Sequence, residues 1–411
     1  MSVPALRFKQ DDGSEFPIWI GKKIGDFVLS HKGGAPLKPA DFVKIGNFEV
    51  IPKKAISKGG YLKLDETEPT FCSERFFEAN QRSVVDNTYL VTTLRDLVPS
   101  GPSIGYIVKY NNNKKYILAQ GVYGIQIGEK LIDDFLIQYS NTDKYRELMQ
   151  TMMVGSTQVH IRNSDFFNTP FSVPSLKEQI KIANFLTAVD EKISQLTQKY
   201  DLLTQYKKGV MQQIFSQELR FKDVDGGDFP EWEDVTLDKI VKFQNGKGHE
   251  NIINEDGKYI VINSKFVASN GKVFKCAAKA LTPIARDTNV MVMSDVPNGK
   301  ALGKCFYISE DNRFTLNQRI CALKSDKHHN KFLYYLINRN PHFLSFDSGV
   351  GQTNLKKEDV LSCSLTIPKS NIEQTKIASF LTAIDDKINS TQSQLQAVKQ
   401  YKQGLLQQMF V

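Results

Sequence analysis

Apolar residues in two stretches of the chain, 178–215 and 373–410, recur in alternating steps of three and four. This is the spacing of a helix whose apolar seam packs against another helix, so each stretch is predicted to be a long helix in a helix pair. The predicted core of that pair is formed by Ile182, Leu186, Val189, Ile193 and Leu196 in the first helix and by Ile377, Leu381, Ile384, Ile388 and Leu395 in the second.

Each seam skips one step, at Lys207 and at Lys402. A lysine at a core position either fixes the register of a helix pair or marks the end of its packing. Gly209 and Gly404 follow closely, and a glycine weakens a helix by about 1 kcal/mol relative to alanine. We therefore favour the end of packing.

The remaining chain shows mixed patterns. Stretches rich in β-branched and aromatic residues, separated by Gly, Asn and Pro, predict strands within Ser103–Tyr110, Tyr116–Ile127, Tyr259–Val267 and Val290–Ser294. Asp134–Gln138 and Phe332–Asn338 fit either short helices or buried strands. Each region outside the long helices is therefore predicted to be an α/β domain with a substantial sheet.

The chain contains an internal repeat. Residues 178–215 and 373–410 are offset by 195 positions and are identical at 19 of 38 positions, including 12 of the first 16. The openings RFKQDDGSEFPIW (7–19) and RFKDVDGGDFPEW (220–232) are offset by 213. A repeat of this kind predicts duplicated structural units, which would be related by a pseudo-two-fold axis if their long helices pair antiparallel. The expected domains are 1–176, helix 177–218, 219–371 and helix 372–411.

Weaker matches lie between these marks. Ile104-Gly105 corresponds to Leu302-Gly303, and Gly155-x-x-Gln158 corresponds to Gly349-x-x-Gln352, which makes the first half longer mainly between Trp19 and Gly105. The two glutamines either contact a ligand such as DNA or stabilise a turn near the long helix. Because both halves share the motif, we favour the structural role.

Composition narrows the functional classes. Lys plus Arg is 53 against 45 for Asp plus Glu, and the net charge of +8 is compatible with a phosphate-bearing partner. Five cysteines without a CxxC motif argue against a disulfide framework or a zinc ribbon, and no apolar run suits a signal peptide or a membrane span. We expect a cytoplasmic protein. Phosphate-binding glycine loops and the HExxH motif are absent, so no catalytic, cofactor-binding or metal-binding residue is predicted.

Short basic and amide-rich runs in expected loops are the candidate DNA contacts. Lysine and arginine can hold phosphates, whereas asparagine, glutamine and arginine can read base edges. Each run taken alone also fits an ordinary solvated turn. The candidates are Lys53, Lys54, Asn112, Lys114 and Lys115 in the first half and Asn245, Lys247, His249, Asn298 and Lys300 in the second.

The two Phe-Pro-x-Trp openings, the two Glu-Gln-x-Lys-Ile-Ala-x-Phe-Leu helix starts and the doubled layout resemble the specificity subunits of type I restriction–modification enzymes. The resemblance covers the whole chain. It implies two target-recognition domains separated by two long helices that form an antiparallel coiled coil. Each domain would read one part of a split, asymmetric site in double-stranded DNA.

The resemblance also implies partners. Two methyltransferase (modification) subunits and motor-nuclease (restriction) subunits would bind the chain, and S-adenosylmethionine, ATP and Mg²⁺ would reside on those partners. The chain itself would be a non-catalytic recognition subunit. Two alternatives are a free-standing bivalent DNA-binding adapter, which would have no methyltransferase gene nearby, and an enzyme with a degenerate site.

Overall fold

The computed structural model describes residues 3–64, 67–296 and 299–411, and the chain divides into two compact units. Unit 1 comprises Met1–Tyr200 and Thr391–Val411, and unit 2 comprises Asp201–Ser390. Each unit therefore contains one variable region, the beginning of one long helix and the end of the other.

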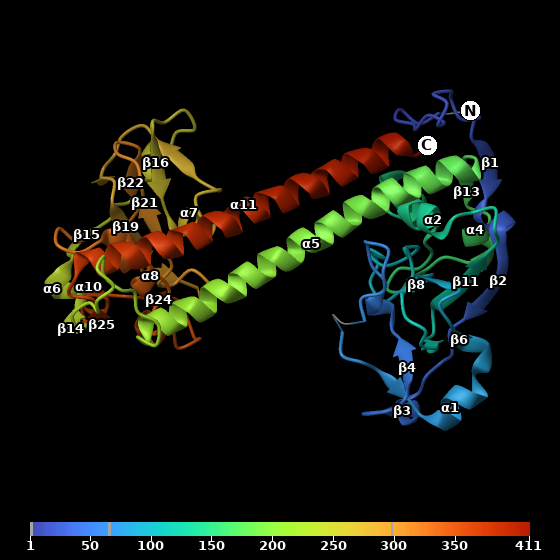
Figure 1. Ribbon diagram of the computed structural model, residues 1–411, viewed down its shortest axis with the longest axis horizontal. Coiled ribbons are helices and arrows are strands. Elements are labelled where there is room, and N and C mark those ends of the chain that lie inside the picture. The colour runs from blue at the N-terminus through green and yellow to red at the C-terminus, as the bar shows by residue number, and fades with distance from the viewer. Residues whose placement is uncertain (1–2, 65–66, 297–298) are drawn as a thin grey trace. The chain divides into compact units, whose positions relative to one another are not determined.

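The two long helices are α5 (Leu176–Phe215) and α11 (Asn371–Met409), close to the predicted bounds. In unit 1, Leu186 of α5 shares a core with Leu406 and Met409 of α11. In unit 2, Ile214 shares a core with Ile377. The start of one helix lies beside the end of the other in both units (Figure 1), so the predicted antiparallel pair is confirmed.

The variable region of unit 1 contains two larger sheets. The first has four antiparallel strands in the order β2 (Val28–Gly33), β11 (Val122–Ile127), β7 (Leu90–Thr93) and β9 (Ile107–Val108). The second is mixed, with the order β3 (Phe42–Val43), β5 (Phe71–Cys72), β4 (Phe48–Ile51), β10 (Tyr116–Leu118) and β6 (Val84–Val85).

Unit 2 repeats this plan, without a counterpart of β3 in its described residues. Its first sheet has the order β15 (Lys242–Asn245), β23 (Ile320–Lys324), β19 (Thr288–Val292) and β21 (Cys305–Ile308). Its second has the order β17 (Lys275–Ala277), β16 (Tyr259–Ile262), β22 (Phe314–Leu316) and β18 (Pro283–Ile284). Both second sheets contain one parallel pair, β4 with β10 and β16 with β22.

Small two-stranded sheets complete each unit. One sheet joins the opening segment to the strand before the long helix, as β1 (Ile20–Lys23) with β13 (Pro170–Val173) and β14 (Glu233–Thr236) with β25 (Ser364–Ile367). The other pairs two short loop strands, β8 (Arg95–Asp96) with β12 (Val159–His160) and β20 (Ser294–Asp295) with β24 (Thr353–Asn354).

Short helices also correspond. Unit 1 contains α2 (Asp133–Ser140), α3 (Asp143–Met152) and α4 (Asn163–Phe167), and unit 2 contains α6 (Leu237–Ile240), α8 (Asn330–Ile337), α9 (Pro341–Leu344) and α10 (Lys357–Leu361). The two segments that fitted either a helix or a strand are helical, as α2 and α8. The first half is longer partly because it carries β3 and α1 (Glu74–Ala79).

The predicted strand segments need two corrections. In Tyr259–Val267 the strand ends at Ile262 and α7 (Ser264–Ala268) begins, because the Asn263 side chain accepts a hydrogen bond from Phe266 N at 2.9 Å and caps the helix. In Ser103–Tyr110 the residues before β9 form a turn in which Gly105 has φ of 80°. Within the described residues, no helix is both long and apolar enough to cross a membrane.

Candidate nucleic-acid interface

A buried ion pair joins the opening segment of the first half to the start of α5. Arg7 donates to both carboxylate oxygens of Glu178, at 2.9 and 2.7 Å, and Trp19 Nε1 donates to the same carboxylate at 3.2 Å. Glu178 has 0% of its surface exposed. The two repeated sequence motifs are therefore the two sides of one contact, which we call the Glu–Arg–Trp clamp.

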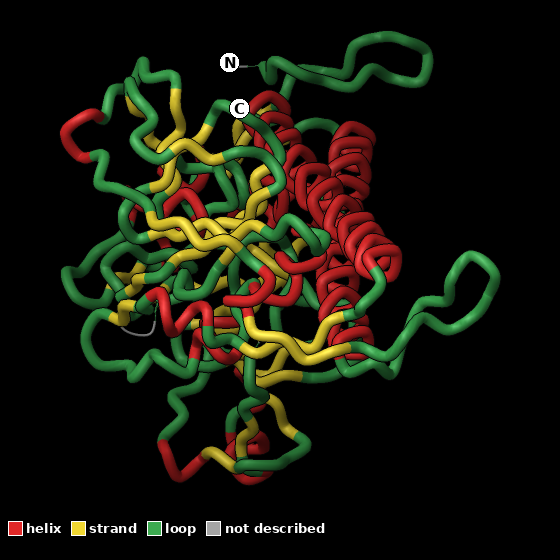
Figure 2. Tube along the Cα trace, turned by 90° about the vertical axis from the view of Figure 1, so that its left-hand side faces the viewer, coloured by secondary structure: helices red, strands yellow, loops and turns green. Residues whose placement is uncertain are grey.

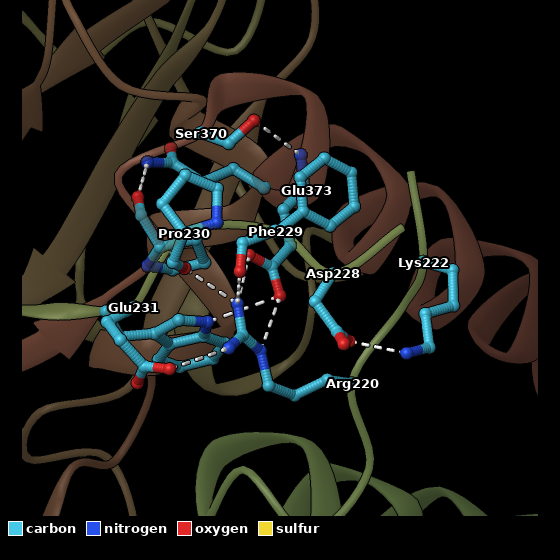
Figure 3. A network of polar contacts seen from close by, with 11 residues as sticks. Arg220, Lys222, Asp228, Phe229, Pro230, Glu231, Ser370 and Glu373 are labelled. Carbon is cyan, nitrogen blue, oxygen red and sulfur yellow. Dashed lines mark hydrogen bonds and ion pairs between the residues drawn. The ribbon is translucent and has the colours of Figure 1, made fainter. Parts of the chain in front are cut away.

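Unit 2 contains the same clamp (Figure 3). Arg220 donates to the carboxylate oxygens of Glu373 at 3.2 and 3.1 Å, and Trp232 Nε1 donates to it at 3.2 Å. Arg220 also donates to the carbonyl oxygen of Pro230 at 2.8 Å, as Arg7 does to that of Pro17. In both clamps the hydrogen bonds with glutamate raise the pKa of the arginine, which stays charged.

The glutamine that follows each clamp glutamate fixes the helix start to the variable region. Gln179 accepts a hydrogen bond from Ile132 N at 2.9 Å, just before α2, and donates to the carbonyl oxygen of Pro174 at 3.0 Å. Gln374 accepts from His329 N at 2.9 Å, just before α8, and donates to the carbonyl oxygen of Pro368 at 2.8 Å. The Glu-Gln motif therefore satisfies polar groups on both sides of the helix start.

A second repeated contact, the Asp–Lys bridge, links the two long helices to each other. Lys402 of α11 contacts both oxygens of Asp190 of α5 at 2.6 and 2.7 Å, and Gln138 of α2 donates to the same carboxylate at 2.7 Å. Each bridge thus joins both long helices to one helix of the variable region.

The bridge in unit 2 has the same form. Lys207 of α5 donates to Asp385 of α11 at 2.6 Å, and the hydroxyl of Tyr335 in α8 donates to it at 2.8 Å. The prediction that these lysines mark the end of packing is wrong, because Ile214 and Met409 beyond them are buried. Each lysine can be accommodated in the helix core because an aspartate on the partner helix neutralises its charge.

The predicted seam residues differ in how deeply they are buried. Ile182 and Leu186 lie in the core of unit 1, and Ile377, Leu381 and Ile384 lie in that of unit 2. The buried set is Ile182, Leu186, Leu196, Ile377, Leu381, Ile384 and Leu395, and the half-buried set is Val189, Ile193 and Ile388.

The candidate DNA contacts of the first half lie in two places. Lys53 and Lys54 belong to a short 3-10 helix after β4, with Lys53 half-buried and Lys54 exposed. Asn112, Lys114 and Lys115 lie on an exposed turn before β10, where the Asn112 side chain accepts from Lys114 N at 3.0 Å and donates to the Tyr116 hydroxyl at 2.9 Å. Asn112 therefore closes the turn, and DNA contact by this group stays a prediction.

The candidates of the second half are separated in a similar way. Asn245 and Lys247 are exposed at the end of β15, and Lys300 is exposed before β21. His249 is only 1% exposed, with ring nitrogens 2.9 Å from Thr315 Oγ1 and 2.7 Å from the carbonyl oxygen of Lys247, an arrangement that opposes a direct base contact. Asn298 lies outside the described residues.

The glycines of the two Gly-x-x-Gln elements are turn residues. Gly155 and Gly349 have φ of 119° and 71°, and a Cβ on Gly155 would lie 2.1 Å from the carbonyl oxygen of Gln158. Gln352 donates to Ser294 Oγ at 2.5 Å, which links β24 to β20. The glutamine thus bridges two loop strands in unit 2, whereas the side chain of Gln158 is exposed.

Sequence reasoning missed one shared element beside these turns, which we call the Asp-capped loop. It follows Asp96 up to Gly105 in unit 1 and Asp295 up to Gly303 in unit 2, where residues 297–298 are not described. Asp96 accepts from Leu97 N and Ser103 N at 2.7 and 3.1 Å. The sequence signal of this loop is the pattern Asp, Pro, Gly and Ile/Leu-Gly, which occurs in both halves.

Asp295 caps the loop of unit 2 through Val296 N and Ala301 N, at 2.9 and 2.7 Å. An arginine from the following helical region holds each loop from the other side, because Arg146 donates to the carbonyl oxygen of Ile104 and Arg339 to that of Lys300. An aspartate and an arginine therefore both bind backbone groups of the described part of each loop.

In the described part of the chain, no group of three or more His, Cys, Asp or Glu residues is arranged to hold a metal ion. The family model described as "Type I restriction modification DNA specificity domain" matches residues 19–205 and 230–400. Each matched segment begins at or near a clamp tryptophan and runs into a long helix.

Similar proteins carry matching descriptions. The type I restriction enzyme MjaVIII specificity subunit of Methanocaldococcus jannaschii is 23% identical over 97% of this chain and 94% of its own length. The MjaIX specificity subunit of the same organism is 22% identical with the same coverage. The crystal structure of the type I S subunit from M. genitalium aligns with a TM-score of 0.65 at 17% identity, covering 100% of this chain and 99% of that one, which shows a shared fold.

Proposed function

Because this chain belongs to the type I restriction–modification DNA specificity family, we propose that it reads the DNA target for such an enzyme. Each variable region would read one part of a split, asymmetric site, and the bases between the two parts would not be read. Sequence information is carried by contacts to bases and not by contacts to phosphates. The two parts of the site would therefore differ because the two variable regions present different side chains to the bases.

The observation that carries this proposal is the division between a repeated frame and divergent surfaces. The clamps, the Asp–Lys bridges and the sheet orders recur in both units. The loops at the sheet ends keep similar backbone contacts but differ in sequence. After β2 the chain runs Gly34-Ala35-Pro36, whereas after β15 it runs Gly246-Lys247-Gly248. A common frame with unlike loops suits a protein that presents two different readers in the same way.

We further propose that the chemistry belongs to partners. Two methyltransferase subunits would bring S-adenosylmethionine, and restriction subunits would bring ATP and Mg²⁺. The pseudo-symmetric frame supports this arrangement, because two equivalent surfaces suit two copies of the same partner. The chain would itself neither methylate nor cut DNA.

The test is a domain exchange followed by methylation mapping of host DNA. Residues 20–176 are replaced by the first variable region of another family member, with Trp19 and Glu178 of the clamp retained and a glutamine kept at the position of Gln138. We expect one part of the methylated site to change and the other part to stay. A matched exchange of residues 233–371 should change the other part only.

Three results would contradict the proposal. If both parts of the site change in either exchange, the two regions do not read separately. If deleting the gene leaves host methylation unaltered while the purified chain still binds DNA, the alternative of a free-standing bivalent adapter is favoured instead. Methyl transfer by the purified chain without any partner would refute the non-catalytic role.

A further inference from the structure

Gly121 in unit 1 and Arg319 in unit 2 occupy the same place in the repeated fold. Leu94 N donates to the carbonyl oxygen of Gly121 at 3.2 Å, and Met293 N donates to that of Arg319 at 3.0 Å. Each lies directly before the equivalent strand, β11 or β23. Each is also next to the start of its Asp-capped loop, since Leu94 and Met293 precede β8 and β20.

In unit 1 the space beside Gly121 is filled by cations from elsewhere. A Cβ built on Gly121 would lie 2.9 Å from Lys53 Cε, 3.3 Å from Lys53 Nζ and 3.0 Å from Arg95 Cβ. The end of the Lys53 side chain therefore packs against the point where a side chain at position 121 would begin. In unit 2 that position is itself an exposed arginine, Arg319. Both halves thus have a positive charge beside the loop, but it comes from non-equivalent positions in the two halves.

In the part of the chain that the structure describes, these charges are offset only in part, by Asp96 near Lys53. Across the described residues, the side chains of Lys53, Arg95 and Arg319 take part in no ion pair. Asp96 is near Lys53, but its carboxylate already accepts hydrogen bonds from the loop backbone. Burial, and then the charge of Arg95, lower the pKa of Lys53. An external anion at this place would relieve the repulsion between the two cations.

What the two halves share here is charge and not shape. Gly121 is matched by Arg319, and Pro102 of the loop is matched by Lys300. A protein partner that packed on both loops would need similar side chains in both, because interfaces depend on shape complementarity. A polyanion with the same backbone at both half-sites needs only the cations. Double-stranded DNA has such a backbone whatever bases it carries.

We propose that Lys53 with Arg95 in unit 1, and Arg319 in unit 2, hold DNA phosphates next to the Asp-capped loops, as equivalent contacts that position each half on the duplex without reading bases. This inference rests on the proposed function and names the surface that touches the DNA backbone.

The experiment measures the binding of the full-length chain to a 40-base-pair duplex of arbitrary sequence, by fluorescence anisotropy from about 50 to 200 mM KCl. The variants are K53Q/R95Q and R319Q. The matched controls are K22Q and K369Q, which remove exposed charges away from the loops in the same two units. Circular dichroism of every variant checks that it is folded, and K53R and R319K keep the charge.

We expect each lost phosphate contact to reduce the slope of log K against log salt by about 0.9, which corresponds to roughly eightfold weaker binding at about 0.1 M salt. K22Q and K369Q should change binding less than about twofold, and K53R and R319K should retain the slope of the unmodified chain. In the combined variant K53Q/R95Q/R319Q the slope should fall by the sum of the two separate reductions, because the contacts lie in separate units.

Three results would contradict either the proposed function or the phosphate contact. If the unmodified chain binds no duplex, the proposed function fails. If it binds and the variants keep the slope of the controls, the phosphate contact is wrong while the proposed function stands. If the variants keep DNA binding but no longer co-purify with a co-expressed methyltransferase subunit, the surface holds a protein partner and the inference is overturned.

Discussion

Glu178 and Glu373 are carboxylates without exposed surface, and each is satisfied by one arginine and one tryptophan. Such a group is stable in the interior only while its partners are present, because an unpaired buried charge is strongly unfavourable. Trp19 and Trp232 are also the two tryptophans of the sequence, so each indole is a natural fluorescent reporter of one clamp.

The first prediction concerns this ion pair. Replacing Glu178 by glutamine leaves the Arg7 guanidinium without a counter-charge, and we expect the free energy of unfolding of unit 1 to fall by about 3 kcal/mol. Urea unfolding followed by Trp19 fluorescence in a W232F background measures the change. E15Q is the control, because Glu15 is exposed and its loss should cost less than about 0.5 kcal/mol. An E178Q variant as stable as E15Q would contradict the prediction.

The second prediction concerns pH. Burial lowers the pKa of His328 below its ordinary value of 6.5, and Gln374 Nε2 lies 3.1 Å from His328 Nδ1. The unfolded chain then binds a proton at a higher pH than the folded chain does, so stability falls as the pH drops from about 6.5 through the folded pKa. Below the folded pKa the loss is complete and constant.

Thermal unfolding between about pH 8 and pH 5 tests this dependence. H328N retains an acceptor for Gln374 but cannot titrate, so its stability should fall less over this range than that of the unmodified chain. H160N, a change at a histidine of the other unit, should leave the fall intact. An equal fall in H328N and the unmodified chain would show that other groups cause it.

At the scale of elements, the Asp–Lys bridge fixes how the two long helices meet. Asp190 contacts α11 through Lys402 and α2 through Gln138, so one carboxylate joins three helices. The Oε1 atom of Gln138 is buried and has no hydrogen-bond partner among the described residues. A lysine at position 190 could donate to that atom, which makes an exchanged pair physically reasonable.

The third prediction follows from this geometry. D190K and K402D each place two like charges together in a partly buried site, and we expect each to lower stability by about 3 kcal/mol. The double variant D190K/K402D restores opposite charges, so it should recover to within about 1 kcal/mol, as a double-mutant cycle measures. Destabilisations that simply add in the double variant would mean that the bridge does not carry the interaction.

Much of the element plan was visible in the sequence. The three–four spacing predicted α5 and α11, because a long apolar seam has few structural explanations. Their antiparallel pairing was expected from the family resemblance. The interpretation of Lys207 and Lys402 failed, since the compensating aspartates stand on the other helix, 178 and 212 positions away. A periodicity along one helix contains no information about such a partner.

The candidate site was less predictable for the same reason. Lys53 was singled out as basic, but its place beside Gly121 and Arg95 depends on how β4 and β11 come together. His249 had the polar neighbours of a surface loop, yet its ring is held inside by Thr315 of β22. Side-chain burial depends on tertiary packing, so a local run of polar residues cannot reveal it.

At the scale of the whole molecule, the two ends of this chain meet in a way that mirrors its middle. Leu6 N donates to the carbonyl oxygen of Gln408 at 2.9 Å, and Leu219 N donates to that of Gln213 at 3.0 Å. The first contact lies within unit 1, where the N and C marks are close together (Figure 1). The arm before Trp19 leaves this contact as a hairpin, seen in green beside the N mark in Figure 2.

The fourth prediction is a circular permutant. Joining Val411 to Ser2 through a short linker and opening the chain near Glu218 should keep both clamps and both bridges, because it exchanges one junction for its symmetry mate. We expect the permutant to fold and, with its methyltransferase partner, to direct methylation to the same site as the unmodified chain. Methylation mapping checks the result, and an opening inside β11 serves as a control that should not fold.

A folded permutant with a changed site, or one that does not fold with any linker up to about ten residues, would show that the junctions are not equivalent.

The repetition of the clamp and the bridge also has a genetic consequence. Residues 178–193 and 373–388 are identical at 12 of 16 positions, so the DNA that encodes them can be similar enough for homologous recombination between related genes. A crossover there joins one variable region to a foreign one while Glu178, Asp190, Glu373 and Asp385 stay at their places. The hybrid inherits every ion pair of the frame, so new combinations of readers can arise in one event without a period of instability.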